Sequence, residues 1–222
     1  VERELALAEW PEPDCTATLV GEGVGVRVDG GRGVGEVELF SGADMRVEAG
    51  ETLLVTAADP RASRAFVLMV GGRIDPSEGR LRVAGHLLPG RAAWVRAHVG
   101  VALLDGAADP LRELRRALAG RTSLVAIDGL DTLAGADRDQ AAALLRDAAE
   151  RAASAPRRRR SRHGETAGGP GRPLTIVASA RREGAALDLL SDAHRPGVSA
   201  LALTACSASA PASASTSSQV IS

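Results

Sequence analysis

The feature that most constrains the fold is a series of short, continuously apolar runs separated by helix-like stretches. Five such runs occur, at 53–56, 98–104, 123–128, 173–180 and 198–204. Strands buried on both faces have this unbroken apolar pattern, and helices between them are the usual crossover connections of a parallel sheet. The sequence therefore predicts an α/β fold, a layered sheet with helices on both faces.

The helix-like stretches have recognisable starts and stops. Asp109 and Pro110 form an N-cap and first-turn pair, and Gly120 ends the same segment. The leucines at 111, 114 and 118 share one face of that helix. Helices are predicted at 60–70, 109–120, 136–153 and near 183–191, and further short strands at 24–30, 35–40, 43–51 and 79–85.

The ends of the chain and one internal segment depart from this pattern. Residues 154–172 are rich in Arg, Gly and Pro and predict a disordered loop. Residues 206–222 are an Ala/Ser-rich tail that is also expected to be disordered. Residues 1–20 are expected to form a loose or partly helical arm, which leaves one domain over 21–205.

Composition excludes several kinds of site. All 27 basic residues are Arg, so chemistry that depends on a lysine amine cannot operate. The two cysteines lie near opposite ends, without metal-site or disulfide spacing. Aromatic residues make up 2%, which argues against base stacking, so nucleic acid is not an expected partner. No apolar run is long enough to span a bilayer, and the chain is expected to be soluble and cytoplasmic.

Several segments together resemble the ATP-binding cassette of ABC transporters. The segment 45–55 is similar to the strand, turn and strand that enter the Walker A phosphate loop. The segment 73–85 is similar in order and spacing to the stretch after the Walker A helix. The segment 115–133 resembles the helix and Walker B strand, and 174–180 resembles the strand before the switch histidine. The resemblance implies a P-loop NTPase-like fold, with ATP and Mg²⁺ as cofactors.

The phosphate loop of the resemblance lacks its chemistry. A Walker A loop needs glycines, a Lys for the phosphates and a Ser/Thr hydroxyl for Mg²⁺. In the gap-free register those positions are Ala57, Ala62, Ser63 and Arg64, followed in the helix by Ala65. No other register restores the loop, because the chain contains no Lys.

Asp59, followed by Pro60, suggests which group occupies the place of the phosphate at the start of the helix. An Asp-Pro pair is a helix N-cap and first-turn pair, so the Asp59 carboxylate is expected to take N–H donors that a phosphate would use. The hypothesis is that the protein fills its own anion site. The alternative is that Arg61 or Arg64 clamps phosphate in a non-standard loop.

The remaining positions of the resemblance are also altered. Asp128 ends the Walker B strand and is the candidate metal ligand, with hydrogen bonding to a nearby loop as the alternative role. Gly129 follows it where a catalytic glutamate is expected, so no base is placed to activate water. Ala180 stands at the switch-histidine position, and neither Leu104 nor Asp105 is the expected glutamine. The short stretch before Asp128 implies that the helical signature subdomain is deleted.

These observations favour a reduced, degenerate cassette core. The expected function is an ABC transporter ATP-binding-protein-like subunit, a pseudo-ATPase with weak or no hydrolysis. It would act as accessory or regulatory partner of a membrane permease, at the inner face of the cell membrane. The sequence does not decide whether the chain also forms a homodimer. One alternative is an active ATPase with a non-standard phosphate loop. Another is a nucleic-acid or membrane-surface module that uses the Arg run at 157–160.

Overall fold

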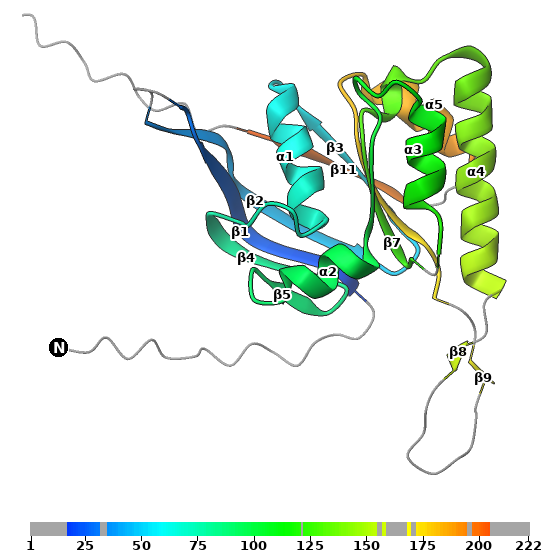
Figure 1. The fold of residues 1–222 in the computed structure, drawn as a ribbon, viewed down its shortest axis with the longest axis horizontal. Coiled ribbons are helices and arrows are strands. Elements are labelled where there is room, and N and C mark those ends of the chain that lie inside the picture. Colours follow the sequence, from blue (N-terminus) through cyan, green and yellow to red (C-terminus); the bar gives the residue numbers. More distant parts are fainter. Residues whose placement is uncertain are drawn as a thin grey trace, which may run out of the picture.

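In the computed structural model, one of the five α-helices in the described residues lies between two β-sheets, and three others cover the outer face of one of these sheets (Figure 1). The structure describes residues 17–31, 35–120, 122–154, 157–158, 168–169, 172–194 and 197–204. Most of the Arg-rich loop and all of the C-terminal tail therefore lie outside the described residues. Within the described residues, no helix combines the length and apolarity that a membrane crossing requires.

The centre of the fold is a parallel sheet of five strands. Their order is β11-β3-β10-β7-β6. All four pairings are parallel, as the alternation of strands and helices predicted. The strands are β3 (Thr52–Ala57), β6 (Gly100–Leu103), β7 (Leu124–Asp128), β10 (Thr175–Ser179) and β11 (Val198–Leu203).

Both faces of this sheet are buried, which explains the unbroken apolar runs. Along β3, Leu53 and Val55 belong to one hydrophobic core and Leu54 belongs to the other. Val177 of β10 lies beside Leu53 on one side and beside Ala126 of β7 on the other. These three side chains all belong to the first core, so the register of the sheet keeps its two cores separate.

Helix α1 (Pro60–Val70) fills the space between the parallel sheet and an antiparallel sheet. Phe66 of the helix is fully buried, and its ring centroid lies 5.9 Å from that of Phe40. The antiparallel sheet has the order β2-β1-β4-β5. Its strands are β1 (Ala17–Asp29), β2 (Glu36–Glu48), β4 (Glu78–Val83) and β5 (His86–Leu88).

Three helices cover the opposite face of the parallel sheet (Figure 1). They are α3 (Pro110–Ala117), α4 (Gly135–Ser154) and α5 (Glu183–Asp192), and each lies within two residues of its predicted start. Asp109 caps α3 by accepting a hydrogen bond from the Arg112 N–H, and the leucines at 111, 114 and 118 are buried, as predicted. A single turn of 3-10 helix, η1 (Leu130–Thr132), follows β7.

Some local predictions were wrong. The stretches predicted as two strands, at 35–40 and 43–51, fall largely in one strand, β2, which ends at Glu48. Gly42, which read as a strand break, has φ +64° and lies where the pairing of β2 with β1 shifts, so the strand continues through a bulge. Residues 17–20, expected in an arm, belong to β1.

Several short elements were not predicted at all. Helix α2 (Ala92–His98) buries only Val95, so the sequence carries no helical apolar stripe there. Strand β5 is only three residues long. Inside the Arg-rich loop, β8 (Arg157–Arg158) and β9 (Gly168–Gly169) form a short antiparallel pair.

Gly79 provides a test of how closely β1 and β4 approach each other. It has φ +73°, and a Cβ there would lie 2.2 Å from the carbonyl oxygen of Gly23. We expect Gly79→Ala to lower the free energy of unfolding by about 2–4 kcal/mol in urea denaturation, because backbone strain adds to displacement of β1. Gly85→Ala is the control, since Gly85 has a similar φ of +84° but open space around it. It should cost only about 1–2 kcal/mol, and equal costs would contradict the close-approach argument.

Candidate functional site

The candidate site lies at the carboxyl edge of the parallel sheet, where β3, β6, β7 and β10 end. In open α/β folds this edge is the usual place for ligands, because loops from separate strands meet there. Most of the residues singled out from the sequence lie at this edge or in the helix that starts from it.

Asp59 caps helix α1, as predicted. Its Oδ1 accepts a hydrogen bond from the backbone N–H of Arg61 at 2.8 Å. The Arg61 guanidinium adds a second contact, with Nη2 2.8 Å from Oδ2. The side-chain and backbone hydrogen bonds from Arg61 lower the pKa of Asp59. The carboxylate is therefore held ionised at the helix start, where a phosphate would otherwise bind.

The other predicted phosphate-loop residues divide into two groups. Ala62, Ser63 and Ala65 are buried in α1, and the Ser63 hydroxyl donates to the carbonyl oxygen of Pro60 at 3.1 Å. Ala57 ends β3 and is half-buried. None of these four side chains contributes a polar group to the edge, whereas Arg64 reaches across it.

Arg64 forms an ion pair with Asp128. Its Nε donates to Oδ2 of Asp128 at 2.7 Å, and its Nη2 donates to the carbonyl oxygen of Asp105 at 2.8 Å. The Asp128 side chain is 6% exposed and that of Arg64 is 40% exposed. The hydrogen bond to Asp128 raises the pKa of Arg64. The guanidinium therefore stands where the resemblance would place a metal-binding hydroxyl.

The second oxygen of Asp128 is also engaged. Oδ1 accepts a hydrogen bond from the Ser179 hydroxyl at 2.7 Å, and the same hydroxyl accepts from the N–H of Gly129 at 3.1 Å. Among the described residues, no group of three or more His, Cys, Asp or Glu side chains is arranged to hold a metal. The arrangement supplies Asp128 with a cation and a hydroxyl from the chain itself.

The network extends to residues that the sequence analysis did not select. Asp105 accepts a hydrogen bond from Nη2 of Arg181 at 2.7 Å and also lies 3.7 Å from Nη2 of Arg64. Asp131, which is buried, accepts from the backbone N–H groups of Arg181 and Arg182 at 3.1 and 3.0 Å. The sequence contained one indication of these residues, because charged residues follow the ends of β6, β7 and β10.

Gly129 shows what a glutamate side chain after Asp128 would meet. It has φ +75°, and a Cβ there would lie 2.9 Å from the Cβ of Asp105. The Asp105 turn therefore occupies the space in which a catalytic side chain would begin. Ala180, at the switch-histidine position, is buried and donates its N–H to the carbonyl oxygen of Val55. Between β6 and β7 the chain forms one helix, α3.

Several solved structures with a similar fold are ATP-binding cassettes of ABC transporters. A dimeric bacterial ABC transporter cassette matches with a TM-score of 0.54 and 10% identity, covering 83% of this chain and 94% of its own. The cbiO1 cassette of Clostridium perfringens, part of the ABC transporter complex cbiONQ, matches with a TM-score of 0.54, 11% identity and coverages of 85% and 87%. The chain has the ABC cassette fold. A nucleotide-free cassette from an ABC transporter gives a TM-score of 0.52 at 12% identity, covering 85% and 90%.

The sequence alone is far from the cassettes of known structure. No family model matches it, and no curated protein matches it. The chain therefore combines the cassette fold with altered side chains at most of the positions that the resemblance assigned to ATP and Mg²⁺, Asp128 being the exception. The residues present do not suit Mg–ATP, because Arg64 pairs with the candidate metal ligand and Asp59 places a negative charge at the phosphate position.

Removing Arg64 tests the importance of its ion pair. We expect Arg64→Ala to lower the free energy of unfolding by about 1–3 kcal/mol in urea denaturation, because it leaves the buried Asp128 carboxylate without a cation. Arg61→Ala is the matched control, since Arg61 and its partner Asp59 are both well exposed. It should cost about 0–1 kcal/mol. A cost for Arg64→Ala no larger than that of the control would show that the pair is not a stabilising contact.

Asp59 can be tested separately as a helix cap. Asp59→Ala should destabilise the protein by about 1 kcal/mol, because it leaves a first-turn N–H of α1 without an acceptor. Asp59→Asn should retain most of the stability, since asparagine caps helices about as well as aspartate. Thermal denaturation of the two variants measures the difference, and equal losses would argue against capping.

Proposed function

We propose that this protein is a cassette-fold subunit that does not hydrolyse ATP and serves as accessory or regulatory partner of a membrane permease. The observation that carries the proposal is the ion pair between Arg64 and Asp128. In this arrangement the positive charge that Mg²⁺ would bring is already supplied by the chain.

Each requirement of ATP hydrolysis meets an obstacle in the described residues. A metal would have to displace the Arg64 guanidinium from Asp128. The same guanidinium also donates a hydrogen bond to the backbone carbonyl oxygen of Asp105. A triphosphate at the start of α1 would face the ionised Asp59 carboxylate. A general base at position 129 would require the Asp105 turn to move.

The permease partner is inferred from the fold and from one structural neighbour. The cbiO1 cassette is part of an ABC transporter complex, and a second neighbour is dimeric. Transfer of these assemblies to this chain is an argument by analogy, since fold alone does not determine function. It predicts that the tagged full chain, crosslinked in membranes of its native host, will be recovered with a polytopic membrane protein. Recovery without any membrane protein would remove the permease from the proposal.

The direct test is binding of ATP in the presence of magnesium. A ligand at 100 times its Kd adds about 2.7 kcal/mol to the stability of the folded state, which for a chain of this size raises Tm by roughly 5–10 °C. We expect Tm at millimolar ATP to be the same with excess Mg²⁺ and with EDTA, and no phosphate release above background.

Two outcomes would favour the alternative of an active ATPase with a non-standard loop. One is a magnesium-dependent rise in Tm, and the other is steady phosphate release that Asp128→Ala abolishes. Asp128→Ala is the informative variant because Asp128 is the candidate metal ligand, whereas Arg151→Ala, at an exposed position in the last turn of α4, serves as a control for general charge effects.

A further inference from the structure

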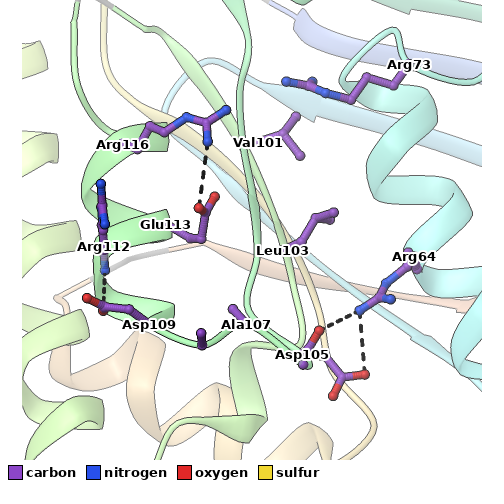
Figure 2. Close-up of a pocket in the computed structure, with 12 residues that line it drawn as sticks. Arg64, Arg73, Val101, Leu103, Asp105, Ala107, Asp109, Arg112, Glu113 and Arg116 are labelled. Atoms are coloured by element: carbon purple, nitrogen blue, oxygen red, sulfur yellow. Dashed lines mark hydrogen bonds and ion pairs between the residues drawn. The ribbon is translucent and has the colours of Figure 1, made fainter.

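A cleft of ≈ 640 Å³ lies between the C-terminal end of α1, strand β6 and helix α3 (Figure 2). Arg73 enters it from the turn after α1, and Arg112 and Arg116 enter it from α3. Val101 and Leu103, on the edge strand of the parallel sheet, provide apolar surface. The volume falls within the ≈ 300–1,000 Å³ typical of small-molecule sites.

The charges that line this cleft are unevenly paired. Asp105 is engaged by Arg64 and Arg181, and Asp109 caps α3. The remaining acid, Glu113, lies 3.7 Å from Nη1 of Arg116. Neither Arg73 nor Arg112 forms an ion pair with any residue that the structure describes. The cleft therefore presents more cationic groups than its own acids neutralise.

Arg73 and Arg116 point toward each other across Val101 (Figure 2). A second, smaller cavity of ≈ 180 Å³ is also lined by these three residues, so the arginine pair lies where the two cavities meet. Burial lowers the pKa of Arg73, and the nearby charges of Arg116 and Arg96 lower it further. Like charges held this close repel each other, and an anion placed between them would relieve that repulsion.

We infer that this cleft binds a small phosphate-bearing molecule, held by Arg73 and Arg116 and independent of magnesium. A guanidinium matches phosphate because its planar fork donates two parallel hydrogen bonds. Arg112 adds a third cation along the same wall, which favours a ligand with more than one phosphate charge. The apolar surface of β6 leaves room for an organic body beside the phosphates. Arg64 of α1 also lines the cleft, but its guanidinium is engaged by Asp128, and Asp59 at the start of α1 does not line it.

Pyrophosphate in EDTA is the probe for the test, with the full chain titrated by calorimetry. We expect saturable binding that Arg73→Ala and Arg116→Ala each weaken about tenfold or more, since each removes charge-assisted hydrogen bonds. Arg73→Lys should recover part of the affinity by restoring the charge without the fork. Circular dichroism of the free variants confirms that they are folded.

Arg61→Ala is the matched control, because Arg61 lies at the start of α1 and lines no part of the cleft. Its binding should equal that of the unmodified chain. Absence of binding, or binding that Arg61→Ala weakens and the cleft variants do not, would overturn the inference. Neither result depends on magnesium, so both are distinct from the test of ATP hydrolysis.

A phosphate group can also come from a lipid headgroup. Sedimentation with phosphatidic acid vesicles, compared with phosphatidylcholine vesicles, distinguishes this source from a soluble phosphate. Selective sedimentation that Arg73→Ala and Arg116→Ala abolish would identify a lipid headgroup at the cleft. Binding of pyrophosphate without selective sedimentation would identify a soluble ligand.

Discussion

The ion pair between Arg64 and Asp128 joins helix α1 to the end of strand β7, and the carboxyl edge is arranged around it. Asp128 is nearly inaccessible to solvent, so its charge requires a partner within the protein. Arg64 supplies that partner and also donates to the carbonyl oxygen of Asp105. Ser179 takes the remaining carboxylate oxygen of Asp128 and contacts Gly129. Elements from four positions along the chain are thereby joined at one point.

An arginine suits this role for reasons that a lysine does not share. The guanidinium carries donors in two directions, so Nε can bind Asp128 while Nη2 binds the backbone at Asp105. It also keeps its charge under all ordinary conditions, and its hydrogen bond to Asp128 raises its pKa further. An arginine at position 64 therefore gives the buried Asp128 carboxylate a permanently charged partner.

The sequence predicted the layered α/β fold because the apolar runs and the Asp-Pro caps are local signals. Asp59 and Asp109 both cap helices, and the strands at 123–128 and 173–180 contain β7 and β10. The contacts of Arg64 with Asp128 and Asp105 could not be predicted. Both partners follow or end other strands, so these contacts depend on the order of strands in the sheet. For the same reason Ser179 and Asp131 were missed: neither stands in a motif, and their roles arise from packing between loops.

The close packing of Gly129 against Asp105 links the position after Asp128 to the ion pairs around it. Any side chain at position 129 would require the neighbouring turn to move, yet that turn is held by Arg64 and Arg181. Replacing Arg64 to free the turn would also strip Asp128 of its cation. Engineering a general base at this edge therefore demands several simultaneous substitutions, because each one alone leaves a less stable protein.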